Sequence, residues 1–173
     1  CMTKDHAGTQ AHQATSKHQL TTNVKLLQKA VLITDGKMLI LQRSADSKSR
    51  PLCGDLPGGN SEWPEGVTQN QENLHQQDIS REILEETGIV VAGEQFTQQN
   101  LLMLRTFYEA EKQVYSIITG WKVVLPDGFN RDQVVISDEH INFAWITIQE
   151  LENYNFGGSK GAFITDLLQL SSK

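Results

Sequence analysis

Apolar residues in this chain fall into short runs separated by turn residues. The first two runs cover residues 24–33 and 37–43 and flank Asp35-Gly36, a strong signal for a two-residue β-hairpin turn. Later runs predict a short strand at residues 89–91, two longer strands at 99–108 and 113–125, and a strand at 141–146. A turn at Pro126-Asp127-Gly128 leads into a predicted long loop over residues 127–138.

Helical periodicity is clearest in the middle of the chain. Residues 74–87 predict a helix in which Asn73 is the N-cap and Gln76 is its capping-box partner. Gly88 is a natural residue to end this helix, because glycine readily adopts the left-handed conformation found there.

Two more helical segments are predicted near the C-terminal end. Thr147 and Glu150 form a capping box for a short helix, and residues 162–170 predict an amphipathic helix after Gly157-Gly158. Strands on both sides of a central helix, with another helix last, indicate the α/β class, with a mixed sheet packed by helices.

The first 20 residues carry no periodic pattern and are rich in polar side chains. We expect a disordered tail over residues 1–20 and a single domain over residues 21–173. Histidines recur in the tail at every sixth position, but no other ligand residues accompany them, so we interpret them as incidental. They are His6, His12 and His18.

Net charge and cysteine content bear on the binding partners and the cellular location expected for this protein. The net charge of −6 argues against a nucleic-acid polymer as partner, because proteins that bind phosphate backbones present basic faces. Cys1 and Cys53 provide neither a zinc-ligand spacing nor a disulfide framework. No stretch resembles a signal peptide or a membrane span, so we expect a soluble cytoplasmic protein without a membrane partner, either a monomer or a homodimer.

Three carboxylates in the predicted central helix form the main candidate for chemistry. Glu82, Glu85 and Glu86 fall within an arc of roughly 100° around the helix axis. Like charges at this spacing repel each other, which weakens a helix unless a cation lies between them. A solvated acidic face is the alternative, but oxygen ligands of this kind suit Mg²⁺ or Mn²⁺.

The sequence around these glutamates resembles the signature box of the Nudix hydrolases. Residues 56–59 read Leu-Pro-Gly-Gly, five residues separate Gly59 from Glu65, and residues 81–89 read Arg-Glu-Ile-Leu-Glu-Glu-Thr-Gly-Ile. The second half matches the box at every defined position. The resemblance implies a Nudix-type α/β/α sandwich around a mixed β-sheet, and an enzyme that hydrolyses a diphosphate linked to another group, usually with Mg²⁺.

The first half of the box departs from the family pattern. The family places seven residues between the first glutamate and the arginine, whereas residues 66–80 separate them here, an insertion of eight. We expect this insertion to form a polar surface loop. The family's pairing of that glutamate with the arginine would then need Glu65 to reach Arg81, or Glu72 to substitute for it. The family's common tryptophan before the glycine turn is Gly54 here.

The resemblance also implies roles for individual residues. Metal ligands would be Glu82, Glu85, Glu86 and the carbonyl of Gly58, and Arg81 would orient a glutamate. The base that activates water would be one of the helix glutamates or Glu139, which lies in a Ser-Asp-Glu-His segment at residues 137–140 that resembles one found after the box in many relatives. Arg43 is either a phosphate-contacting arginine or an exposed residue at a strand end.

Substrate identity follows only by elimination. The marks of the ADP-ribose, NADH and coenzyme A subgroups are missing, which favours a MutT-like (deoxy)nucleoside triphosphate pyrophosphohydrolase. Aromatic residues at 107–108 and 143–145 are predicted to form a pocket for the base. The alternatives are a pyrophosphatase of ADP-ribose or another nucleoside diphosphate derivative, and a Nudix domain that binds a nucleotide without catalysis.

Overall fold

The computed structural model describes residues 20–173, and the tail predicted over the preceding residues lies outside this range. The strands are β1 (Val24–Thr34), β2 (Lys37–Arg43), β3 (Gly54–Asp55), β4 (Gly58–Asn60), β5 (Leu101–Glu109), β6 (Val114–Val124) and β7 (His140–Ile146). The α-helices are α1 (Leu74–Thr87) and α2 (Ala162–Ser171). Short 3-10 helices cover Gly93–Gln95, Gln98–Asn100, Arg131–Gln133, Ile148–Asn153 and Gly158–Gly161.

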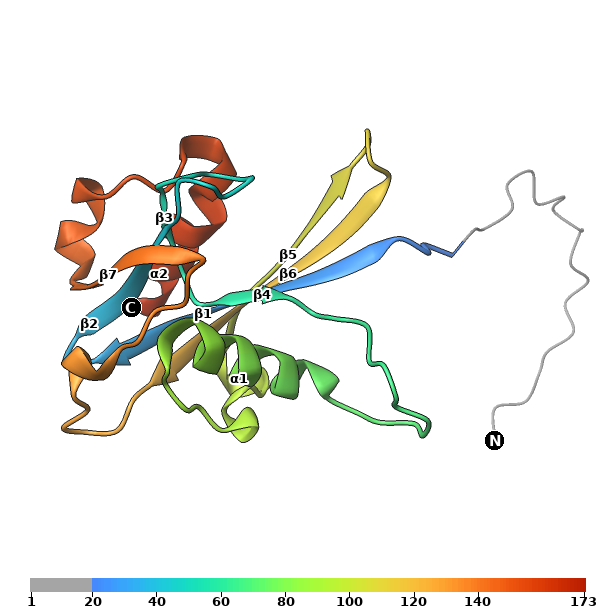
Figure 1. The fold of residues 1–173 in the computed structure, drawn as a ribbon, viewed down its shortest axis with the longest axis horizontal. Helices are drawn as coiled ribbons and strands as arrows, with labels where there is room; N and C mark the ends of the chain where they lie inside the picture. Colours follow the sequence, from blue (N-terminus) through green and yellow to red (C-terminus); the bar gives the residue numbers. More distant parts are fainter. Residues whose placement is uncertain (1–19) are drawn as a thin grey trace, which may run out of the picture.

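One mixed sheet of seven strands forms the centre of the domain (Figure 1). Its main order is β3-β2-β1-β6-β5, with β4 paired to β1 and β7 paired to β2. The β1–β6 pair is parallel and runs from Val24 opposite Tyr115 to Ile33 opposite Val124. The remaining pairs are antiparallel, including the predicted hairpin around Asp35-Gly36.

Alternating residues of β1 and β2 fill two separate cores, one on each face of the sheet. Ala30 and Leu32 face α1, where they pack with Ile79 and Ile83. Val31 faces the other way and packs in a cluster that includes Leu167 of α2. Because a strand alternates its side chains between faces, this pattern buries β1 on both sides. The α/β/α sandwich predicted from the sequence is therefore confirmed.

Two local predictions are wrong. Asn73 precedes α1, but its backbone is left-handed, with φ 57°, and its side chain makes no capping hydrogen bond. Gln76 donates its side-chain N–H to the carbonyl of Phe96 at 3.3 Å and does not complete a capping box. Residues 89–91 bury Ile89 and Val91 but pair with no strand among the described residues. The end of α1 at Gly88 and the capping box of Thr147 with Glu150 are confirmed.

The insertion in the glutamate–arginine segment lies on the surface. Every residue from 62 to 73 is exposed, and the chain re-enters the packed domain at Leu74. Within residues 20–173, no helix combines the length and apolar character needed to cross a bilayer.

We expect deletion of residues 66–73 to preserve the fold and the chemistry of the domain. The deleted segment is exposed throughout, and its last residue provides no side-chain cap whose loss would destabilise α1. The variant should melt within about 3 °C of the wild type in a thermal scan by circular dichroism. A folded variant that loses all phosphoanhydride hydrolysis would show that the loop belongs to the site.

Candidate active site

Two of the three helix glutamates line the main cleft of the molecule. Glu82 and Glu86 lie one turn apart on α1 and border a cavity of about 870 Å³. Glu85 is 55% exposed and lies at 3.4 Å from the Nη1 of Arg81, outside the cleft lining. The acidic face predicted from helical spacing therefore divides, with Glu82 and Glu86 in the cleft lining and Glu85 exposed outside it.

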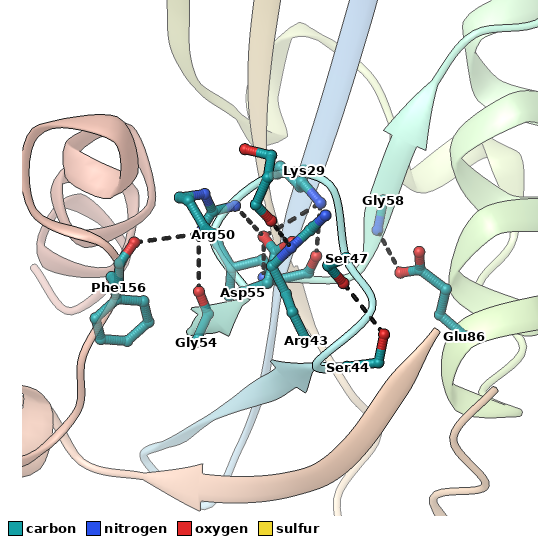
Figure 2. Close-up of polar contacts among 12 residues, drawn as sticks. Lys29, Arg43, Ser44, Ser47, Arg50, Gly54, Asp55, Gly58, Glu86 and Phe156 are labelled. Atoms are coloured by element: carbon teal, nitrogen blue, oxygen red, sulfur yellow. Dashed lines mark hydrogen bonds and ion pairs between the residues drawn. The ribbon is translucent and has the colours of Figure 1, made fainter. Parts of the chain in front are cut away.

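A glycine turn holds Glu86 in place. The N–H of Gly58 donates a hydrogen bond to Glu86 Oε2 at 3.0 Å (Figure 2). Gly58 has φ 138°, and a Cβ at this position would lie 1.9 Å from the carbonyl oxygen of Gln28. Only glycine fits this approach of β4 to β1. The turn thus fixes the buried carboxylate at the wall of the cleft.

Arg81 contacts several acidic side chains beside the cleft. Its Nη1 lies 3.4 Å from Glu82 and 3.7 Å from Glu62. Neither predicted partner pairs with Arg81: Glu65 borders the same surface hollow without an ion pair, and the partners are Glu62, Asp78, Glu82 and Glu85. Arg81 lies where it can orient glutamates without lining the cleft.

A second acidic residue from another element approaches Glu86. Glu86, Glu139 and His140 each provide a possible ligand atom, and these atoms lie within 4.8 Å of one another. In the part of the chain that the structure describes, this is the one such group of three. Ser44 donates its backbone N–H to the carbonyl of Glu139 at 3.0 Å, which anchors the start of β7.

The protonation of the acidic wall is shifted by burial. Burial raises the pKa of Glu86 to about 8, although the charge of Lys29 and the N–H of Gly58 act in the opposite direction. Burial also raises the pKa of Glu82. A divalent cation bound between these carboxylates would stabilise their charged forms.

The opposite wall of the cleft is basic and is built around Asp55. This carboxylate is fully buried and pairs with Arg43 at 2.6 Å, Lys29 at 3.2 Å and Arg50 at 3.3 Å (Figure 2). Burial alone would raise the pKa of Asp55, but the charges of Lys29 and Arg50 and the N–H of Leu56 hold it well below its usual range. All three cations line the cleft. Asp55 therefore fixes three positive charges opposite the glutamates.

Comparison with known proteins decides the family. Residues 27–167 match the NUDIX domain. The chain belongs to this family. The Nudix box predicted from the sequence thus contains the cleft glutamates, and the chain is a Nudix hydrolase, an enzyme that acts on pyrophosphate bonds. A comparison with curated proteins returned no match.

Solved Nudix structures share the fold. A MutT protein from Methanosarcina mazei Go1 is 24% identical, with a TM-score of 0.58 over 87% of this chain and 94% of its own. A MutT NUDIX hydrolase from Burkholderia pseudomallei is 20% identical, with a TM-score of 0.56 over 84% and 98%. The NUDIX domain of Shewanella oneidensis NrtR, solved with ADP ribose, is 13% identical, with a TM-score of 0.56 over 89% and 88%.

The Nudix fold separates the aromatic residues that were predicted to form a base pocket. Phe107 and Tyr108 are exposed on β5, at the far edge of the sheet from β7, which carries Phe143 and Trp145. Trp145 packs against the core on the α1 face and donates its Nε1–H to the carbonyl of Arg131. None of the four lines the cleft, so that prediction is wrong.

Three functional residues of this Nudix site were missed in the sequence. Lys29 and Asp55 were not singled out, and His140 was noted only as part of a motif. Lys29 gave a usable signal, because it directly precedes the apolar stretch at residues 30–33, and a charged residue within a buried strand is expected to have a partner. Arg43 lies in the cleft wall as expected for a phosphate contact, with its guanidinium bonded to Asp55 and to the carbonyl of Ser49.

The raised pKa of Glu86 predicts a stability that falls with pH in metal-free protein. The folded state favours the protonated carboxyl, so the contribution to stability is complete below the ordinary carboxyl pKa of 4.5 and is lost as pH rises through about 8. In EDTA, Glu86→Gln should raise the melting temperature above pH 8 by about 5 °C and flatten its decline. Equal pH slopes for the two proteins would contradict the assignment.

Proposed function

We propose that this Nudix hydrolase cleaves a nucleoside or deoxynucleoside triphosphate to the monophosphate and pyrophosphate, in a reaction that depends on Mg²⁺ or Mn²⁺. The observation that carries the proposal is a cleft that has a cluster of carboxylates and a cluster of cations in its lining. The carboxylates Glu82, Glu86 and Glu139 belong to the first, and Lys29, Arg43 and Arg50, held by Asp55 apart from Glu86, form the second (Figure 2). Further cations in the lining are Lys25, Lys48 and Lys160.

The basic wall supports binding of a phosphate chain. Lys29, Arg43 and Arg50 are held by the buried carboxylate of Asp55, so they need little reorganisation when an anion binds. Phe163 is the one aromatic side chain of the cleft lining apart from His140, and the Arg50 guanidinium lies 5.8 Å from its ring centre. Its ring is the candidate surface for a nucleobase, in place of the aromatic residues predicted earlier.

The acidic wall supports the hydrolytic step. Glu82, Glu86 and Glu139 are the residues that would hold a divalent cation, with the Gly58 carbonyl and Glu85 as further candidate ligands from the family resemblance. A bound cation supplies neutralisation of the diphosphate oxygens and a more acidic water. Glu82, with its raised pKa, or Glu139 would accept the proton of the attacking water. The water oxygen bonds to phosphorus as the bridging P–O bond breaks and pyrophosphate leaves.

A substrate panel tests this proposal. The full chain is assayed with Mg²⁺ or Mn²⁺ against normal and oxidised nucleoside triphosphates, ADP-ribose and diadenosine polyphosphates. The value of kcat/KM is measured for each substrate, and the products are identified by chromatography. We expect a triphosphate to be the best substrate and to yield monophosphate and pyrophosphate. If ADP-ribose exceeds every triphosphate by about tenfold or more, a difference of about 1.4 kcal/mol, a dinucleotide-type pyrophosphatase is the correct function.

A further inference from the structure

His140 is a buried imidazole at the cleft wall with an unused hydrogen-bonding atom. The residue is 6% exposed and lines the cleft. Its Nδ1 is buried and has no hydrogen-bond partner among the described residues. Because leaving a buried polar atom without a partner is costly, such a group usually has a partner that binds it in the working protein.

The backbone of β7 turns His140 toward the cleft by a β-bulge. On β2, Gln42 pairs with Asn142, but its neighbour Arg43 pairs with His140, so Ile141 is the extra residue. Ile141 is 53% exposed. A bulge of this kind redirects a side chain and is frequent beside active sites. The start of the strand is fixed further by the His140 N–H, which donates to the Ser137 carbonyl at 3.1 Å.

His140 is a candidate metal ligand because its side chain lines the cleft beside two carboxylates. A neutral imidazole has one ring nitrogen free to accept a proton or a metal ion. One ring nitrogen of His140 lies within 4.8 Å of carboxylate oxygens of Glu86 and Glu139, a separation that one shared cation could bridge.

We propose that His140 is a direct nitrogen ligand of the metal ion, together with Glu86 and Glu139, and that this site selects Mn²⁺ over Mg²⁺. The inference rests on the proposed function of the cleft as a metal-dependent site and adds a ligand outside the Nudix box. Mg²⁺ prefers oxygen ligands, whereas imidazole favours first-row transition ions. A mixed set of two carboxylates and one imidazole therefore favours Mn²⁺.

Pulsed electron paramagnetic resonance on bound Mn²⁺ tests the ligand directly, because a coordinated nitrogen modulates the electron spin echo. The full chain is used with His6→Gln, His12→Gln and His18→Gln, which leaves His75 and His140 as its histidines. We expect nitrogen modulation that changes when the protein carries ¹⁵N-histidine. The modulation should vanish in His140→Gln and persist in His75→Gln, a matched control outside the cleft.

Affinity provides a second readout. In His140→Gln the Kd for Mn²⁺ should rise at least about tenfold, while the Kd for Mg²⁺, measured by competition, should change less than about threefold. Circular dichroism checks the fold of each variant. If His140→Gln does not fold, the labelled protein with intact His140 still decides the question, because absence of histidine nitrogen modulation there would overturn the proposal.

The experiments on His140 can fail or succeed independently of the proposed hydrolase function. Histidine modulation in a protein that hydrolyses no phosphoanhydride would support the ligand and contradict the enzymatic proposal. Hydrolysis by a protein without the modulation, or with equal loss of Mn²⁺ and Mg²⁺ affinity in His140→Gln, would contradict the ligand and leave the enzymatic proposal intact.

Discussion

Replacing Glu86 by glutamine lowers kcat/KM for the best phosphoanhydride substrate by about 10²- to 10³-fold, with the fold retained. The substitution keeps the shape of the side chain and removes a carboxyl that is 5% exposed, is fixed by the Gly58 N–H and can carry a negative charge when a cation binds. Since the charge is the property that binds a divalent cation, metal affinity should fall with activity. Steady-state kinetics at saturating Mg²⁺ and Mn²⁺, together with metal titration by calorimetry, measure both effects.

Two further variants serve as comparisons for the activity of Glu86→Gln. Glu152→Gln changes an exposed carboxylate outside the cleft and should keep activity within about twofold of the wild type. Glu85→Gln tests whether Glu85 is a metal ligand. A large loss of activity supports the ligand set implied by the family resemblance, which includes Glu85. A small loss supports the set formed by the residues that line the cleft, which excludes it. Activity of Glu86→Gln within about threefold of the wild type would refute the metal assignment of Glu86.

Asp55→Asn should be more destabilising than any single substitution of a charged residue that lines the cleft. It leaves Lys29, Arg43 and Arg50 without the buried negative charge that holds them. Removing one partner of a buried ion pair costs about 3–5 kcal/mol, which corresponds to a fall in melting temperature of about 10 °C for a domain of this size. Because the lowered pKa of Asp55 favours the charged form in the folded state, its contribution to stability is present above its ordinary pKa of 3.8 and is lost in acid.

Two comparisons isolate this effect. Asp46→Asn removes an exposed carboxylate from the same cleft and should change stability by less than about 0.5 kcal/mol. The double variant Asp55→Asn with Lys29→Met should be less destabilised than the sum of the single variants, since it removes a charge along with its partner. A melting temperature of Asp55→Asn within about 2 °C of the wild type would contradict the role of Asp55 as the centre of the basic wall.

The parts of the fold that the sequence predicts best depend on local chemistry. The Asp35-Gly36 turn, the helix end at Gly88 and the capping box at Thr147 each follow from residues next to one another, and the structure has all three. Asn73 shows the limit of such rules, because its backbone adopts a left-handed conformation in which its side chain does not cap the helix.

Elements that depend on distant partners were not predicted. β3 and β4 contain mainly glycine and polar residues, and they are strands because β2 and β1 lie beside them. The basic wall has the same origin, since Lys29, Arg43, Arg50 and Asp55 come from two long strands, a loop and a short strand. The Nudix box located the glutamates, but which of them line the cleft depends on the segments packed beside α1, such as the glycine turn that binds Glu86.

Hydrolysis in H₂¹⁸O tests the central claim most directly, namely that the cleft carries out metal-dependent attack of water on a phosphoanhydride. The best substrate of the panel is converted by wild-type protein and by Glu86→Gln, with Mn²⁺, Mg²⁺ or EDTA, and the products are analysed by ³¹P NMR. We predict one ¹⁸O atom in one phosphate product, formed by the wild type with either metal and strongly reduced in EDTA or with Glu86→Gln. Labelled product at equal rates in EDTA or with Glu86→Gln, or no labelled product from any substrate, would contradict the account.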